Sequence, residues 1–148
     1  MCGIAGVWTT DRLDEDDVAR MTRTLRHRGP DDFGAWTDAD AGIGLGNQRL
    51  AVIDLSPAGH QPMVSRSGRY VLTYNGEIYN HAELRRDLSS DWHGHSDTET
   101  LLVAIDRWGL RGAVEKCVGM FAFALWDREA RTLSLVRDRI GEKPLYYG

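Results

Sequence analysis

Short runs of β-type residues alternate with a few amphipathic helical stretches, and this order constrains the fold of the chain most strongly. The alternation contains neither an internal repeat nor a low-complexity linker. Runs joined by short turns favour antiparallel pairs, and helices grouped between and outside such runs are typical of a layered α+β domain. The predicted strands are 3–8, 33–37, 43–50, 69–74, 120–126 and 132–137, with a further strand starting at 145–147, and the predicted helices are 14–27, 81–88 and 98–108.

Local signals fix the ends of several of these elements. The helix over 14–27 has apolar residues at helical spacing, acidic residues in its first turn and basic residues in its last. It is expected to end before Gly29-Pro30. The strand over 69–74 is expected to end at Asn75-Gly76, a favoured turn pair. The segment 127–131 is predicted to join the strands 120–126 and 132–137 into an antiparallel pair.

Length and composition favour a single domain over residues 1–148. A chain of 148 residues buries about two thirds of its unfolded surface, so it needs no disulfide or metal staple. Cys2 and Cys117 are its only cysteines, too few for a disulfide framework and without zinc-site spacing. We expect Cys117 to be a buried small residue. The cysteine usage favours a reducing cytoplasm.

Charge and hydropathy exclude two classes of partner. The net charge is −4 and both signs are interspersed, so the chain offers no basic surface for nucleic acid or for a membrane. No segment approaches the roughly 20 apolar residues that span a bilayer. The sequence therefore predicts a cytoplasmic protein with no nucleic-acid or membrane partner.

Cys2 stands directly after the initiator methionine, which makes it a candidate nucleophile. Removal of Met1 leaves Cys2 with a free α-amine, which titrates near pH ~8 and can act as a base close to neutrality. A thiol is the most nucleophilic side chain available, so nucleophile and base would share one residue. The alternative is a small apolar residue at the start of a buried strand.

Two further segments carry polar groups at the ends of predicted strands. Asn75 and Gly76 follow a strand directly and offer an amide donor and a backbone N–H. Their alternative is a type I′ turn. Arg49 ends a strand of otherwise small and apolar residues, where its guanidinium can hold a carboxylate by two hydrogen bonds. Its alternative is a solvated strand end or a structural ion pair.

Asp97 stands at the start of a predicted helix. Either Ser96 or Asp97 as the N-cap, with Glu99 or Thr100 in the first turn, explains the cluster without a function. Asp97 can also accept an ammonium group. A nucleophile, oxyanion donors, a carboxylate clamp and an ammonium acceptor together suit attack on the side-chain amide of a free amino acid.

Motifs over the whole chain resemble one known family. They are residues 1–6 (MCGIAG), 26–31 (RHRGPD), 49–56 (RLAVIDLS), 59–63 (GHQPM), 74–80 (YNGEIYN) and 96–99 (SDTE), in that order. This set resembles the glutaminase domain of class II glutamine amidotransferases. The later segments 119–127 (GMFAFALWD) and 137–147 (RDRIGEKPLYY) are similar to the asparagine synthetase branch.

The resemblance implies a fold and a set of roles. The fold is a four-layer αββα N-terminal nucleophile hydrolase sandwich, with the nucleophile opening a central strand and the last strands missing. Cys2 would be the nucleophile with its α-amine as base, and Asn75 Nδ2 and the Gly76 N–H would form the oxyanion hole. Arg49 would hold the α-carboxylate of glutamine and Asp97 its α-ammonium. The pocket would also be lined by the backbone of Leu50, Ala51, Val52, Ile53 and Glu77.

The implied activity is hydrolysis of L-glutamine to glutamate and ammonia. It needs no metal or cofactor, and ATP and magnesium would act only at a synthetase domain that this chain lacks. The ammonia would pass to such a domain, in cis or in trans, and a homodimer is also expected. Many relatives have histidine where this chain has Asn47, so that histidine's role is not carried over. The alternative is a catalytically silent domain that binds glutamine or a partner.

Overall fold

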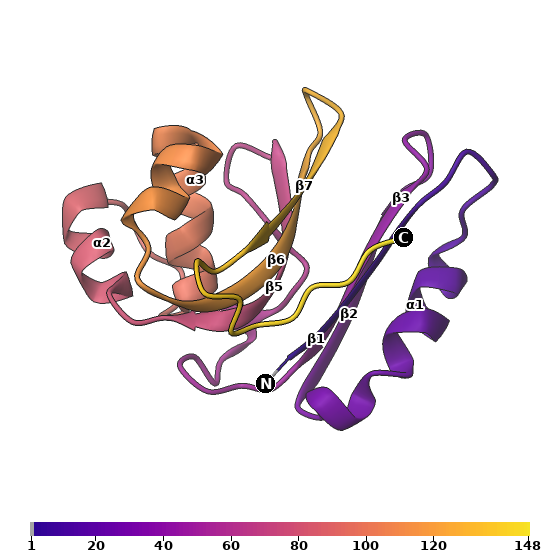
Figure 1. Cartoon of the computed structure of the whole chain (residues 1–148), viewed down its shortest axis with the longest axis horizontal. Coiled ribbons are helices and arrows are strands. Elements are labelled where there is room, and N and C mark those ends of the chain that lie inside the picture. The colour runs from indigo at the N-terminus through magenta and orange to yellow at the C-terminus, as the bar shows by residue number, and fades with distance from the viewer. Residues whose placement is uncertain (1) are drawn as a thin grey trace.

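A computed structural model describes residues 2–148 of the chain. Two antiparallel sheets lie face to face, and helices cover the outer face of each sheet (Figure 1). The α+β sandwich of four layers predicted from the sequence is therefore confirmed. No helix within residues 2–148 is both long enough and apolar enough to cross a membrane.

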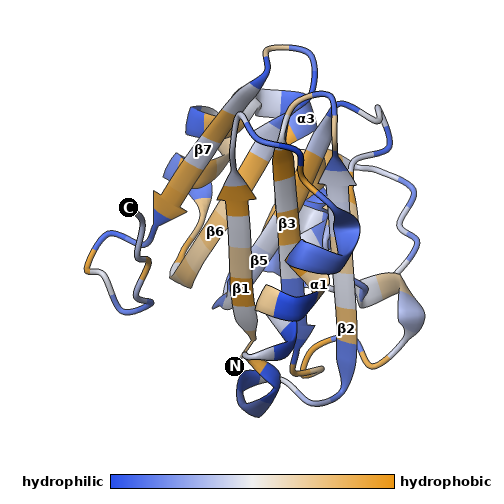
Figure 2. Cartoon of the chain, turned by 90° about the vertical axis from the view of Figure 1, so that its right-hand side faces the viewer, coloured by the Kyte–Doolittle hydropathy of each residue, from blue (hydrophilic) through white to orange (hydrophobic). Residues whose placement is uncertain are grey.

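The first sheet contains β1 (Gly3–Trp8), β3 (Ile43–Arg49) and β2 (Asp32–Asp38), in that order. The helix α1 (Glu15–Arg23) packs on its outer face, toward the viewer in Figure 2. The expectation that the nucleophile opens a central strand is wrong for residues 2–148. Only β3 pairs with β1 there, so β3 takes the centre and β1 lies at the edge.

The second sheet contains β4 (Met63–Val64), β5 (Tyr70–Ile78), β6 (Gly119–Asp127) and β7 (Thr132–Arg137), in that order. β5 and β6 pair residue by residue over nine positions. The prediction that a strand ends at Asn75-Gly76 is wrong, as is the alternative of a turn there. Both residues lie inside β5 because β6 continues to pair with it as far as Ile78.

Two apolar clusters hold the layers together. The larger lies between the second sheet and the helices α2 (His81–Leu88) and α3 (Asp97–Lys116), and it includes the buried Cys117 as predicted. The smaller lies between the two sheets and is centred on Trp126. Hydrophobic residues accordingly follow the strands in Figure 2, whereas the visible side of α1 is mainly hydrophilic.

Three further predicted elements differ from the structure. The helix over 14–27 stops at Arg23 and gives way to the 3-10 helix η1 (Arg26–Arg28), because the N–H and the hydroxyl of Thr24 both donate to the carbonyl of Met21. The helix over 98–108 extends to Lys116 through a kink at Gly109. The strand expected from residue 145 does not form, since residues 145–147 have no strand partner within residues 2–148. The two-residue strand β4 and the 3-10 helix η2 (Pro57–Gly59) were not predicted.

Candidate active site

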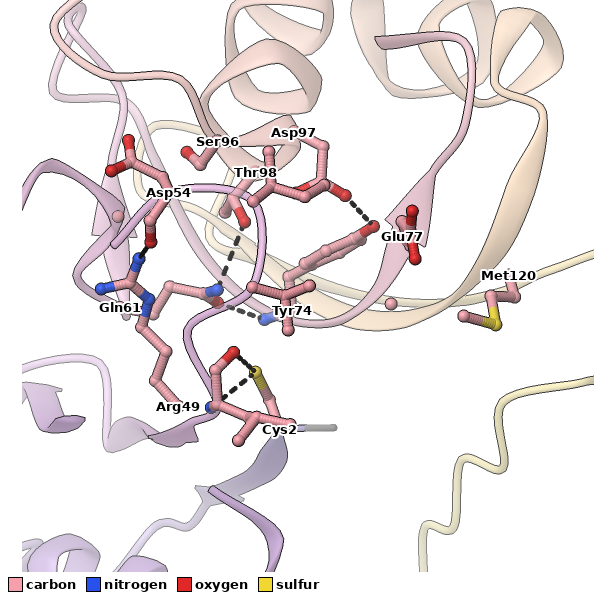
Figure 3. Close-up of a pocket in the computed structure, with 15 residues that line it drawn as sticks. Cys2, Arg49, Asp54, Gln61, Tyr74, Glu77, Ser96, Asp97, Thr98 and Met120 are labelled. Atoms are coloured by element: carbon pink, nitrogen blue, oxygen red, sulfur yellow. Dashed lines mark hydrogen bonds between the residues drawn. The ribbon is translucent and has the colours of Figure 1, made fainter. Parts of the chain in front are cut away.

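A cavity of about 180 Å³ opens where the two sheets meet the start of α3 (Figure 3). It brings together residues that lie far apart in the sequence. Those singled out from the sequence are Cys2, Arg49, Leu50, Val52, Ile53, Gly76, Glu77 and Asp97. Those to which no binding or catalytic role was assigned from the sequence are Asp54, Gly59, Gln61, Tyr74, Ser96, Thr98 and Met120.

Cys2 lies just before β1, half-buried at one side of the cavity. The Leu50 N–H donates to its Sγ at 3.4 Å. Burial raises the pKa of the thiol, and the Leu50 N–H and the charge of Arg49 oppose this only in part. The thiol is therefore protonated at neutral pH and needs a base before it can attack. Met1, whose removal is predicted to free that base, lies outside the described residues.

Arg49 ends β3 and its guanidinium is almost fully buried against the cavity. It donates to the carbonyls of Asp54 and Ser56, and it lies 3.9 Å from the Asp32 carboxylate. Gly59 packs directly on it, since a Cβ there would lie 2.0 Å from Nη2. The solvated alternative is wrong. A guanidinium has five N–H groups, so others remain for a carboxylate ligand.

Asp54 links the loop that follows Arg49 to the segment before α3 by hydrogen bonds. Its carboxylate accepts hydrogen bonds from the N–H and hydroxyl of Ser56 and from the N–H of His95. Burial alone would raise the pKa of Asp54, but these hydrogen bonds and the charge of Arg49 outweigh it and lower the pKa to about 2. The loop therefore carries a fixed negative charge behind the guanidinium.

The exposed edge of β5 directs backbone groups into the cavity. Successive residues of an antiparallel strand turn their N–H and C=O groups to opposite edges. Tyr74 bonds to side chains on the edge away from β6, and the Ile78 N–H donates to Asp97 Oδ2 at 2.9 Å on that same edge. Gly76 lies midway between them and lines the cavity, so its N–H points to the same edge.

Asn75 takes the other orientation. It shares a face of β5 with Thr73, whose hydroxyl donates to the Gly46 carbonyl of the first sheet, so its side chain lies between the sheets. It is buried, and its Oδ1 has no hydrogen-bond partner within residues 2–148. Neither Asn75 nor Ala51 is among the residues that line the cavity. The Ala51 N–H donates instead to Asp31 at 2.9 Å.

Asp97 is the first residue of α3 and is buried. Ser96 is the N-cap, because its hydroxyl accepts from the Glu99 N–H, so Asp97 is free of that task. Its Oδ2 accepts from the Tyr74 hydroxyl at 2.8 Å and from Ile78. Burial and the neighbouring carboxylate raise the pKa of Tyr74 well above its usual value, which keeps it a donor. Both of these hydrogen bonds within residues 2–148 go to Oδ2 rather than to Oδ1.

Two buried amides, those of Asn47 and Gln61, lie behind the cavity, and their contacts are seen only in the structure. The Asn47 Nδ2 is within hydrogen-bond distance of the Gln61 Oε1, the Thr73 hydroxyl and the Tyr74 carbonyl. None of its described hydrogen bonds goes to Arg49. Gln61 in turn accepts from the Tyr74 N–H and donates to Thr98. Gln61 lies within a motif noted in the sequence, but only the fold shows what it contacts.

The chemistry of the cavity follows from these groups. It holds a thiol, a buried cation, a buried anion and the backbone N–H of Gly76, which come from different segments of the chain. A zwitterionic amino acid matches the two charges, because burying only one of them would leave the other unpaired. The thiol and the N–H are suited to form and stabilise a tetrahedral intermediate.

Comparisons with known proteins identify the family of the chain. A family model described as a glutamine amidotransferase domain matches residues 1–148. Asparagine synthetase [glutamine-hydrolyzing] 3 of Bacillus subtilis is 39% identical, over 99% of this chain and 25% of its own length. A putative asparagine synthetase [glutamine-hydrolyzing] of Mycobacterium tuberculosis is 41% identical, over 87% of this chain and 21% of its own length.

A solved structure has the same fold. Glutamine phosphoribosylpyrophosphate amidotransferase from B. subtilis, complexed with ADP and GMP, aligns with a TM-score of 0.70 at 20% identity. The alignment covers 86% of this chain and 35% of that one. The likeness shows that the two chains share the layered arrangement of sheets and helices. The chain spans a quarter or less of the length of the two synthetases named above.

Proposed function

The chain belongs to the glutamine amidotransferase domain family, and on that premise we propose that it hydrolyses L-glutamine to glutamate and ammonia through a Cys2 thioester. The observation that carries the proposal is one cavity lined by Cys2, Arg49, Gly76 and Asp97. These four residues come from separate segments, and each suits a different part of the same small zwitterion.

Binding uses the two buried charges. Arg49 pairs with the α-carboxylate of glutamine and Asp97 Oδ1 with its α-ammonium. The backbone of residues 50–53 and of Glu77 borders the remainder of the ligand. A glutamine residue inside a peptide lacks both charges and would leave both protein groups unpaired, so the site selects the free amino acid.

The reaction proceeds in two halves. After Met1 is removed, the α-amine of Cys2 takes the thiol proton, directly or through a water, and the thiolate attacks the side-chain carbonyl carbon. The C–N bond then breaks, and the proton passes to the leaving nitrogen, which departs as ammonia. Water hydrolyses the γ-glutamyl thioester to glutamate and restores the thiol.

The developing oxyanion needs donors aimed at it. We assign this role to the Gly76 N–H and to Asn75 Nδ2. The edge direction of Gly76 and the buried, partly unpaired amide of Asn75 support the assignment. Losing one such donor typically lowers kcat by about a hundredfold or more.

The ammonia would serve a synthetase component. The names of the relatives support an asparagine synthetase-like partner, in cis or in trans, which uses ATP and magnesium. The glutaminase half-reaction itself requires no metal or cofactor in this scheme. The ammonia acceptor is aspartate or another carboxylate.

The test is a glutaminase assay on protein whose intact mass shows that Met1 is absent. We expect equal amounts of glutamate and ammonia, and acid quenching during turnover should trap a γ-glutamyl adduct on Cys2. Protein that retains Met1 should be inactive, because its Cys2 has no free amine. A silent domain would bind glutamine without forming glutamate, and that result would overturn the proposal.

A further inference from the structure

We propose that Gln61, held by Asn47, is a positioning residue that fixes the open edge of β5 and with it the direction of the Gly76 N–H. The inference rests on the proposed glutaminase function. Gln61 would act through the backbone of β5 rather than by contact with the reacting atoms.

The edge of β5 toward β4 lacks a strand partner where the site begins. β4 contains only Met63 and Val64, which pair with Leu72 and Val71. Within residues 2–148, Tyr74 and the residues after it have no strand on that side. Without other partners, the N–H and C=O groups on this edge would be unpaired, and only β6 on the opposite edge would hold the strand.

Two side-chain amides take the place of the absent strand. The Gln61 Oε1 accepts from the Tyr74 N–H at 2.7 Å, and the Asn47 Nδ2 donates to the Tyr74 carbonyl at 3.2 Å. Asn47 also donates to Gln61 Oε1 at 3.1 Å, which holds the two amides together. Both are buried, Asn47 completely, so water does not compete for these bonds. Both backbone groups of Tyr74 are thereby hydrogen-bonded on the edge away from β6.

The same Gln61 reaches the helix that carries Asp97. Its Nε2 donates to the Thr98 hydroxyl at 3.3 Å, and Thr98 is the second residue of α3. Asp97 links the same helix to β5 a second time, since its Oδ2 accepts from the Ile78 N–H farther along the strand. Gly76 therefore lies between two anchored positions on one edge.

The arrangement predicts a specific kinetic effect. Removing the anchor at Tyr74 frees one end of the segment that presents the Gly76 N–H. A displacement of about 1 Å in a catalytic group can cost about a hundredfold in rate. Because Arg49 and Asp97 keep their own contacts, ground-state binding of glutamine should change much less than kcat.

The experiment uses Gln61→Met, which keeps the volume and removes the hydrogen bonds, and Asn47→Leu. Thr22→Val, which loses a buried hydroxyl bond in α1 at a residue that does not line the cavity, controls for general loss of stability. We expect kcat to fall about tenfold to a hundredfold in Gln61→Met with KM within about threefold, and a smaller fall of the same kind in Asn47→Leu. Thr22→Val should retain the wild-type kcat.

Amide hydrogen exchange supplies a readout that does not need turnover. The Tyr74 N–H should exchange at least about tenfold faster in Gln61→Met than in wild type, and at the wild-type rate in Thr22→Val. Unchanged exchange, an unchanged kcat or a rise confined to KM would overturn the inference. If wild type forms no glutamate, the proposed function fails, and the exchange rate alone decides whether Gln61 holds β5.

Discussion

Among single residues, Asn75 is buried, and part of its side-chain amide is unpaired within residues 2–148. Its Oδ1 has no hydrogen-bond partner within residues 2–148, and such an atom costs stability. We therefore expect the free energy of unfolding of Asn75→Ala to lie within about 1 kcal/mol of that of wild type. We expect its kcat to fall about a hundredfold, because an oxyanion donor is lost. Denaturant unfolding and steady-state kinetics measure the two quantities.

Asn80→Ala is the matched control for Asn75→Ala. The Asn80 amide accepts from the Val118 N–H and donates to the Lys116 carbonyl, so it is used by the fold. This variant should lose stability and keep kcat, the opposite pattern. A kcat near that of wild type in Asn75→Ala would remove Asn75 from the oxyanion hole.

Cys2 should be needed for the chemical step and Arg49 for the binding of glutamine. Cys2→Ala removes the nucleophile but neither buried charge, so we expect no hydrolysis and glutamine affinity within about tenfold of wild type. Arg49→Ala should lose most of the affinity, since Asp97 would then face the α-ammonium alone. Calorimetry with glutamine measures both. Equal loss of binding in the two variants would contradict this division of roles.

Cys2, Arg49, Gly76 and Asp97 were identified from the sequence because ordered motifs mark them, and the structure brings all four to one cavity. Their individual roles stay predictions. Gln61 and Tyr74 were missed for a physical reason. Their importance comes from hydrogen bonds between segments that are distant in the sequence, and no local pattern reports such pairs.

Among the elements, the loop after β3 depends on one carboxylate. The pKa of Asp54 is about 2 in the fold against 3.8 ordinarily. That difference corresponds to about 2 kcal/mol of folding free energy at neutral pH. We expect Asp54→Asn to lose about this much stability and to raise KM, because the loop that holds Arg49 loosens. Denaturant unfolding from pH 7 down to pH 2 checks the energy, and kinetics at pH 7 check KM.

The sign of the pH effect follows from a lowered pKa. The contribution of Asp54 is fully present above its ordinary pKa of 3.8 and is lost as the pH falls toward about 2, so wild type and Asp54→Asn should converge there. Asp127→Asn is the control, since Arg69 lowers the pKa of that carboxyl outside the cavity. It should show a pH-dependent loss of stability with an unchanged KM. A stability gap for Asp54→Asn that persists at pH 2 would contradict the role of the carboxylate.

The strand pairs were largely predictable, and the predictions failed at element ends for different reasons. Asn75-Gly76 is a turn signal, yet long-range pairing with β6 keeps the pair in a strand. A Cβ at Gly76 would lie 2.4 Å from the Met120 carbonyl oxygen, so the glycine serves close strand approach rather than a turn. The predicted end of α1 was wrong because the hydroxyl of Thr24 donates to the carbonyl of Met21, a helix carbonyl.

For the whole molecule, alternation of β and α character was enough to predict a layered α+β domain, and the family resemblance supplied the number of layers. It did not give the order of strands within a sheet, because pairing depends on contacts between distant segments. The site draws on both sheets, since Cys2 precedes β1 and Arg49 ends β3, whereas Gly76 belongs to β5. The packing of one sheet on the other therefore sets the distances within the site.

The contact of Trp8 with Trp126 joins the two sheets at the end of β1 opposite Cys2. The rings meet edge to face with centroids 5.6 Å apart, and the Trp8 Nε1 donates to the Ala41 carbonyl. Trp8 is 55% exposed, so Trp8→Ala should cost about 1–2 kcal/mol, less than a fully buried tryptophan. We also expect a severalfold fall in kcat/KM, because β1 positions Cys2. Tyr79→Ala, equally exposed but outside this contact, should cost less stability. Equal losses in the two variants on denaturant unfolding would show that the tryptophan pair does not hold the sheets together.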